Sequence, residues 1–221
     1  HILQLLKSTS HTLQNKYLYT YNSCYNEFMN SRWFILKLLI IFFFALSLRI
    51  YMVGSIPLGV RNDEASFGYN AYSILETGKD EHGEKYPLIF KAFGDQKLPA
   101  YMYSIVPAIK IFGLNNFAVR LPSVLAGTLS ALIFYFIALR FDYIRKYAFI
   151  ASLIFAASPW SIILSRSAYE SNLGLMFFLG GLYFLIKNIQ EKKRSDALLS
   201  GILFGLSWYS YIAYRLISAL L

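Results

Sequence analysis

Asp63 and Glu64 form an acidic pair shortly after the first long apolar run of the chain. A carboxylate in this place could serve as a general base that accepts a proton from a hydroxyl group attacking an electrophilic carbon. The same pair could instead stabilise a helix N-terminus, because Asp is a preferred N-cap and acids there contribute about 0.3–1 kcal/mol. The spacing of the two residues alone leaves both interpretations open.

Three charged residues elsewhere are candidates for the same site. Lys97 precedes Pro99 at the start of a predicted helix, where a cation beside free N–H groups could bind a phosphate or simply be solvated. Arg49 lies near the far end of the first apolar run, where its side chain could reach the membrane interface. Glu170 begins a later apolar run, where a carboxylate is usually a cap, yet it faces the same side of the membrane as Asp63.

A metal site is not indicated by the residue types. His82 is isolated in a turn-rich loop and has no partner at the spacing of metal ligands. The single cysteine, Cys24, excludes a disulfide or a Cys-based metal site within this chain.

Arg61 is a further cation on the same side of the membrane as Asp63, and it is interpreted as a solvated side chain.

The composition places these residues in a polytopic membrane protein. The chain is 57% apolar and only 15% charged, which is more apolar than a soluble domain of 221 residues needs. Several apolar runs reach the length of about 20 residues that crosses a bilayer. The net charge of +9 is explained by Lys and Arg on cytoplasmic loops, so no nucleic-acid partner is expected.

The expected organisation is a bundle of membrane-spanning helices with one long outer loop. We expect residues 1–32 to be an N-terminal extension, poorly ordered or interfacial, with Met29 as the natural start. Residues 33–221 form the membrane domain, which we expect to be truncated at its end. The spans are predicted at about 33–53, 117–141, 147–164, 172–187 and 197–214, with a sixth beginning at 216, and the loop at 54–116.

The loop is predicted to hold two interfacial helices. The first runs from Glu64 to about Thr77, with Asn62 or Asp63 as its cap and a glycine just beyond its end, and its apolar residues share one face. The second, Leu98–Phe112, opens with a proline, is closed by a glycine and is too short to span. The fold class is therefore all-α.

The basic clusters set the expected orientation. One cluster lies between the second and third spans and another between the fourth and fifth, so both face the same side if the spans alternate. The positive-inside rule places that side, and the N-terminus, in the cytoplasm. The loop at 54–116 and the short connection 165–171 then face outward. The clusters comprise Arg140, Arg145 and Lys146, and Lys187, Lys192, Lys193 and Arg194.

Two segments of this chain resemble a known enzyme class. NDEASFGYNAYSILETGKDEHGEKYPL and DQKLPAYMYSIVPAIKIFGLNNFAVRLPSVLAGTLSAL are similar to the N-terminal part of GT-C membrane glycosyltransferases. These are the glycosyltransferase family 39 relatives of dolichyl-phosphate-mannose protein mannosyltransferases and of the lipid A aminoarabinose transferase. The resemblance covers about residues 33–221 and implies a helical bundle whose first outer loop carries two interfacial helices.

The resemblance also implies roles for individual residues. Asp63 matches the catalytic acidic residue of the family, Glu64 its partner, and Glu170, more loosely, an acid at the mouth of the fourth span. Lys97 matches a lysine that faces the donor phosphate, although Leu98 replaces the first proline of that motif. Gln96 stands where the aminoarabinose enzyme has a glutamate, which puts a metal-assisted variant in doubt; no cofactor is implied with certainty.

The implied reaction is sugar transfer from a polyprenyl-phosphate donor to a hydroxyl of a protein, glycan or lipid acceptor at the outer face of the cell membrane. Asp63 would act as base in a single, inverting displacement, and Lys97, with Arg49, would stabilise the departing phosphate. A transporter is an alternative, but no charged or Gly/Pro-broken midplane and no internal repeat is apparent. A non-catalytic scaffold predicts no clustering of Asp63, Lys97 and Glu170.

Overall fold

The computed structural model describes residues 32–220. The expectations for the N-terminal extension, including Met29 as the start, therefore lie outside the described residues. The chain divides into two units, His1–Ile40 and Ile41–Leu221. Of the first unit the structure describes only the residues that begin helix α2, and every feature of the site belongs to the second.

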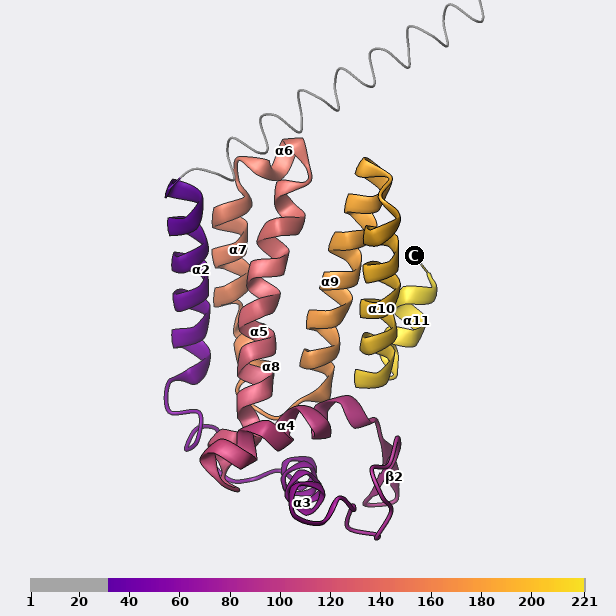
Figure 1. The fold of residues 1–221 in the computed structure, drawn as a ribbon. Helices are drawn as coiled ribbons and strands as arrows, with labels where there is room; N and C mark the ends of the chain where they lie inside the picture. The colour runs from indigo at the N-terminus through magenta and orange to yellow at the C-terminus, as the bar shows by residue number, and fades with distance from the viewer. Residues whose placement is uncertain (1–31, 221) are drawn as a thin grey trace, which may run out of the picture. The chain divides into compact units, whose positions relative to one another are not determined.

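The described chain is predominantly helical, which confirms the predicted fold class (Figure 1). One short antiparallel hairpin, which the sequence did not lead us to expect, interrupts the helices and pairs Phe90 with Lys97. The elements in chain order are α2 (Arg32–Ile50), α3 (Asn62–Thr77), β1 (Phe90–Ala92), β2 (Asp95–Lys97), α4 (Pro99–Phe112), α5 (Asn116–Leu139), α6 (Asp142–Arg145), α7 (Ala148–Ala157), α8 (Pro159–Ser165), α9 (Glu170–Glu191), α10 (Arg194–Ser210) and α11 (Ala213–Ala219).

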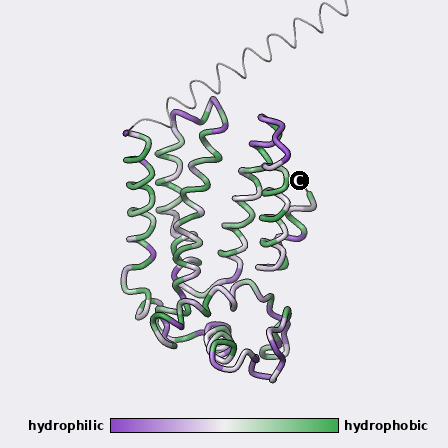
Figure 2. Tube along the Cα trace, viewed as in Figure 1, coloured by the Kyte–Doolittle hydropathy of each residue, from purple (hydrophilic) through white to green (hydrophobic). Residues whose placement is uncertain are grey.

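Within the second unit, a helical bundle carries a layer of loop helices across one end. Helix α5 packs against α7, α8 and α9, and α9 packs against α10. Helix α4 lies across that end of the bundle, with α3 packed on its other side (Figure 1). Hydrophilic residues gather in the loop layer and at the opposite turns, with more hydrophobic helices between them (Figure 2). This pattern is that of a multi-pass membrane protein.

Three described helices, α2, α5 and α9, are long and apolar enough to cross a bilayer, and α7 with α8 makes a fourth if the bent pair counts as one. The predicted span 147–164 is thus broken, with a 57° bend between the two helices. Pro159 explains the break, because proline lacks an N–H and disfavours helical backbone in the residue before it. Helix α10 has 17 residues and is not among these spans, so the predicted span at 197–214 stays a prediction.

Arg49 stabilises this break instead of reaching the membrane interface. Its guanidinium donates to the Ala156 carbonyl at 3.1 Å, to Ser161 Oγ at 2.8 Å and to Ser165 Oγ at 3.2 Å. The side chain is fully buried. A broken helix leaves carbonyl groups without a partner inside the helix. A buried guanidinium has several donors and can satisfy them, which explains why Arg49 lies at the break.

Gly127 marks the closest approach of α5 to α8, and it gives a first prediction. A Cβ added there would overlap Ser165 and approach Arg49 Nε to 2.9 Å. We expect Gly127→Ala to lower the free energy of unfolding by about 1–3 kcal/mol, as overpacking in a tight core does. Gly201→Ala is the matched control, because an added Cβ there meets no atom within 4 Å. Equal thermal unfolding midpoints of the two variants in detergent would contradict this packing.

The two loop helices form close to the predicted positions. Helix α3 ends with Gly78 at φ 70°, and α4 ends with Gly113 at φ 74°, both as expected for glycine at a helix C-terminus. The cap of α3 was misassigned, since Arg61 is the N-cap residue. The apolar face of α3 does not lie open on a membrane; Phe67 and Ala71 belong to a buried cluster that includes residues of α4 and α5.

Both basic clusters lie at one end of the bundle. Arg140, after α5, forms a 2.7 Å ion pair with Glu191 at the end of α9, and Lys193 pairs with the same carboxylate at 2.8 Å. At the other end, the Ala168 N–H in the 165–171 connection donates to Glu64 of α3 at 2.9 Å. The long loop and the short connection therefore share the end away from these clusters, as the alternation of spans requires.

Candidate functional site

A cavity of about 510 Å³ opens between the loop layer and the bundle. It brings together Asp63, Lys97 and Glu170, which the sequence predicted for one site. The residues that line it are Arg61, Asp63, Glu64, Phe67, Lys97, Trp160, Leu164, Ser167, Ala168, Tyr169, Glu170, Ser171 and Tyr211. They come from α3, β2, α8, the 165–171 connection, the start of α9 and the segment after α10, so distant parts of the sequence meet here.

Lys97 is held between carboxylates. Its ammonium lies 3.2 Å from Asp63 Oδ1 and 3.2 Å from Asp95 Oδ2, and its side chain is only 14% exposed. Burial alone would lower the pKa of Lys97, but hydrogen bonds to Asp95 and Asp63 and the charge of Glu170 raise it above its ordinary value. Lys97 is therefore a cation throughout the neutral pH range.

The β-hairpin places Lys97 at the cavity. Phe90, which pairs with Lys97 in the register, is fully buried, and its ring lies edge-on to Tyr103 at 5.8 Å between centroids. The two turn residues, Phe93 and Gly94, both have positive φ, as a two-residue hairpin turn requires. The buried Phe90 holds β1 against the core. Because β2 is hydrogen-bonded to β1, the same contact determines where Lys97 lies.

Glu170 offers an unused hydrogen-bond acceptor. It is the first residue of α9, and its Oε2 atom is buried without a hydrogen-bond partner among the described residues. Buried polar atoms are paired in the great majority of cases, so this carboxylate oxygen in the cavity lining is an acceptor that a water molecule or a ligand can use. Sugar hydroxyls are donors of the required kind.

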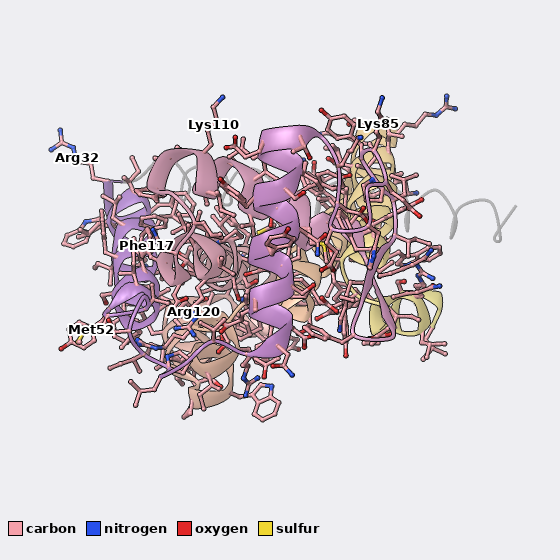
Figure 3. All side chains as sticks on the ribbon, turned by 90° about the horizontal axis from the view of Figure 1, so that it is seen from below. Arg32, Met52, Lys85, Lys110, Phe117 and Arg120 are labelled. Atoms are coloured by element: carbon pink, nitrogen blue, oxygen red, sulfur yellow. The ribbon has the colours of Figure 1, made fainter. Side chains whose placement is uncertain are left out.

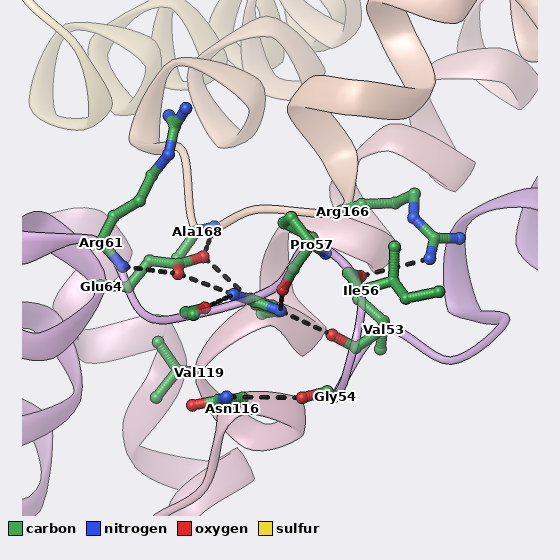
Figure 4. A network of polar contacts seen from close by, with 12 residues as sticks. Val53, Gly54, Ile56, Pro57, Arg61, Glu64, Asn116, Val119, Arg166 and Ala168 are labelled. Carbon is green, nitrogen blue, oxygen red and sulfur yellow. Dashed lines mark hydrogen bonds and ion pairs between the residues drawn. The ribbon is translucent and has the colours of Figure 1, made fainter.

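Glu64 is buried and surrounded by hydrogen-bond donors. Its carboxylate is 2% exposed and accepts from Arg120 Nε and Nη2, both at 2.9 Å, from the Ala168 N–H at 2.9 Å and from the Arg61 N–H at 3.2 Å (Figure 4). Burial alone would raise the pKa of Glu64, but these hydrogen bonds outweigh it and lower the pKa. Through these contacts Glu64 holds the start of α3 and the 165–171 connection together, and the catalytic role expected for it stays a prediction.

Arg120 is the residue that the sequence interpretation missed. It lies in α5, is 1% exposed, and donates to three loop carbonyls besides Glu64, so each of its N–H groups has a partner. The signal was available, because an ionisable residue in an apolar helix needs a partner nearby. The accepting carbonyls belong to Val53 at 2.9 Å, Pro57 at 3.0 Å and Gly59 at 2.8 Å.

Two other sequence candidates lie elsewhere. Gln96 is exposed in β2 and Arg49 is buried at the helix break, and neither lines the cavity. Arg61, interpreted as solvated, lines the cavity with its guanidinium 5.0 Å from the centre of the Tyr169 ring. Within residues 32–220, no group of three or more His, Cys, Asp or Glu side chains is arranged to hold a metal ion.

A family model described as dolichyl-phosphate-mannose-protein mannosyltransferase matches residues 96–221, which is more than half of the chain. Lys97 and Glu170 fall within the match, whereas Asp63 and Glu64 precede it. No curated protein sequence matches the chain. The match confirms the resemblance seen in the sequence.

Two solved structures of ArnT from Cupriavidus metallidurans share the fold. The apo structure matches with a TM-score of 0.60 and 17% identity, covering 80% of this chain and 32% of that one. The structure bound to undecaprenyl phosphate matches with a TM-score of 0.64 and 16% identity, covering 86% and 35%. The chain thus spans about a third of the length of these structures, and the likeness concerns the fold alone.

Proposed function

Because this chain belongs to the dolichyl-phosphate-mannose-protein mannosyltransferase family, we propose that it forms part of an integral-membrane glycosyltransferase with a polyprenyl-phosphate sugar as its donor. The acceptor is a hydroxyl group of a protein, a glycan or a lipid at the outer face of the membrane. The fold match to ArnT bound to undecaprenyl phosphate supports a polyprenyl-phosphate lipid as the donor's carrier.

The observation that carries this proposal is the meeting of Asp63, Lys97 and Glu170 in one cavity. A non-catalytic scaffold would have no need to gather a carboxylate, a cation and an unpaired buried carboxylate oxygen from three separate segments. A transporter would place such charges near the middle of the spans. Here they lie at the end of the bundle that is opposite to the basic clusters.

The reaction we propose is a single displacement at the anomeric carbon. The acceptor oxygen bonds to that carbon while its proton passes to the Asp63 carboxylate. The bond between the carbon and the phosphate oxygen breaks with its electron pair, so the departing lipid phosphate gains one negative charge. Lys97 faces that charge, and the oxocarbenium-like transition state is compatible with the nearby carboxylates. The product has the inverted anomeric configuration.

Glu170 orients the sugar in this scheme. Its Oε2 atom, which has no hydrogen-bond partner within residues 32–220, accepts a hydrogen bond from a sugar hydroxyl. The outward placement of the cavity fits the donor, because nucleotide sugars are cytoplasmic and a lipid carrier brings the sugar to the other face. The proposed topology puts the N-terminus and the basic clusters in the cytoplasm.

The experiment that tests this function is sugar transfer by the full-length protein in proteoliposomes. We expect transfer from a mannosyl-, glucosyl- or aminopentosyl-polyprenyl phosphate and none from the matching nucleotide sugar. The anomeric configuration of the product, measured by NMR, is expected to be opposite to that of the donor. Transfer from the nucleotide sugar alone, or retention of configuration, would contradict the proposal.

Lys97→Gln gives a more specific prediction. Removing the ammonium takes a charge-assisted hydrogen bond from the departing phosphate, which is worth about 1.5–3 kcal/mol, so kcat/KM should fall by roughly 10- to 150-fold. Lys91→Gln is the matched control, since Lys91 lies on the neighbouring strand of the hairpin but outside the cavity. An equal effect of the two substitutions would show that Lys97 acts only through the net charge of the loop.

A further inference from the structure

The charged side chains that line the cavity differ in how many ion pairs they form within the protein. Lys97, expected to bind the donor phosphate, is shared between Asp63 and Asp95 at 3.2 Å each. An ammonium has three N–H donors, so two carboxylates leave one donor of Lys97 for a phosphate and a second cation is needed to bind it more fully. Asp63 and Glu64 are likewise paired with cations. This leaves Arg61 as the lining cation without an ion pair among the described residues.

Arg61 is held in the cavity by contacts that leave its hydrogen-bond donors unused. Its backbone N–H donates to Glu64 Oε2 at 3.2 Å, which ties its position to the buried Glu64–Arg120 pair (Figure 4). Its guanidinium lies 5.0 Å from the centre of the Tyr169 ring. This cation–π contact uses the face of the ring, and the side chain donates no hydrogen bond to the described residues. The N–H groups of the guanidinium therefore remain available to a ligand.

Tyr169 is positioned by the same network. Its chain neighbour Ala168 donates its N–H to Glu64 Oε1 at 2.9 Å, while the next residue, Glu170, begins α9. One carboxylate thus binds the backbone N–H of Arg61 and that of Ala168, the residue before Tyr169. Arg61 is exposed, and its contact with the Tyr169 ring keeps the guanidinium in the lining of the cavity, where it can meet an anion.

We infer that Arg61, supported by the Tyr169 ring, binds the phosphate group of the lipid-linked donor in the cavity that also holds Lys97. This inference rests on the proposed function and assigns the main phosphate contact to a residue outside the segment matched by the family model. A guanidinium suits this ligand, since it can donate two parallel hydrogen bonds to a phosphate and does not lose its charge. Arg61 also stabilises the charge that the phosphate gains when the bond to the sugar breaks.

The inference is tested by equilibrium binding of undecaprenyl phosphate to the full-length protein in detergent, with undecaprenol as the probe that lacks phosphate. Arg61→Gln should weaken binding of undecaprenyl phosphate by about ten- to a hundredfold and leave undecaprenol binding unchanged. Arg61→Lys should fall between, because it keeps the charge and loses the paired donors. Tyr169→Phe should bind as the wild type does, whereas Tyr169→Leu should bind about two- to fivefold more weakly.

Lys110→Gln is the matched control for charge. Lys110 is exposed in α4, points away from the molecule (Figure 3) and does not line the cavity, so its loss should leave binding unchanged. Wild-type affinity of Arg61→Gln for undecaprenyl phosphate would overturn the inference. So would an equal loss of undecaprenol binding, which reports a damaged fold. Tighter binding of inorganic phosphate than of undecaprenyl phosphate would overturn the assignment to a lipid-linked group.

The failure of this inference can be separated from the failure of the proposed reaction. Asp63→Asn should bind undecaprenyl phosphate at least as tightly as the wild type, because it frees a donor of Lys97, and it should lose sugar transfer. If Asp63→Asn transfers sugar at the wild-type rate while Arg61→Gln still loses lipid phosphate binding, the base assignment fails and the phosphate site stands. If Asp63→Asn is inactive while Arg61→Gln binds normally, the reaction stands and the phosphate site fails.

Discussion

Replacing Asp63 by asparagine is expected to lower the rate of sugar transfer by about 10²- to 10⁴-fold, which is the usual contribution of a general base. The amide has nearly the same shape as the carboxylate but cannot accept the proton of the attacking hydroxyl. Asp63 lines the cavity and is 55% exposed at its side chain, so the substitution should leave the fold intact. The measurement is the single-turnover rate with a polyprenyl-phosphate sugar.

Asp95→Asn is the matched control for this prediction. Asp95 lies 3.2 Å from the same lysine as Asp63 does, but it is exposed in β2 and does not line the cavity. Its loss should reduce the rate only a few-fold, because exposed ion pairs are worth about 0.2–1 kcal/mol. If both substitutions gave the same small loss, Asp63 would be a partner of Lys97 and not the base.

Glu64→Gln is expected to have the largest effect on the fold. The substitution leaves Arg120 charged and buried without its carboxylate, and removing one partner of a buried pair costs about 3–5 kcal/mol. Every group that contacts Glu64 is a donor, so the NH₂ of a glutamine would also face donors. Transfer should fall as well, because Arg61 and Ala168 lose their common anchor.

The measurement is the unfolding midpoint of the full-length protein in detergent, with Glu76→Gln as control. Glu76 is exposed on the same helix, and its substitution should change the stability by less than about 0.5 kcal/mol. Because the folded pKa of Glu64 is lowered, its stabilisation is complete above the ordinary pKa of 4.5 and is lost as the pH falls through the lowered value. A Glu64→Gln protein as stable as Glu76→Gln would show that the buried pair is not an anchor.

The helices of the loop could be predicted because their ends carry strong local signals. Pro99 can only begin α4, and Gly78 and Gly113 adopt the positive φ that ends α3 and α4. Apolar length likewise indicated the spans formed by α2, α5 and α9. The break at Pro159 was visible in the sequence but was passed over, because apolar composition is continuous across it.

The parts of the site that could not be predicted depend on contacts between distant residues. Asp63, Lys97 and Glu170 were identified by their chemistry, and the cavity confirms that they meet. The role of Glu64 is set by Arg120, which lies 56 residues further along the chain. The hairpin also had no clear sign in the sequence, because each strand has only three residues and the turn places Phe93 where asparagine or glycine is usual.

The buried Glu64–Arg120 pair supports the residues that line the cavity. Glu64 joins α3, which carries Arg61 and Asp63, to the connection that carries Tyr169 and Glu170. Residues that must hold a phosphate, a sugar and a hydroxyl group at fixed relative positions need a rigid support of this kind. We therefore expect the Glu64–Arg120 pair to affect the proposed reaction by positioning these residues.

The central claim is that the cavity faces away from the cytoplasm, where the donor is presented on a lipid. The most direct test is labelling of single-cysteine variants in intact cells with a membrane-impermeant maleimide, after replacing Cys24 by serine. Lys85, exposed in the long loop (Figure 3), and Lys192, exposed at the opposite end of the bundle, are suitable positions. We predict that K85C is labelled in intact cells and K192C only after permeabilisation; the reverse pattern would contradict the account.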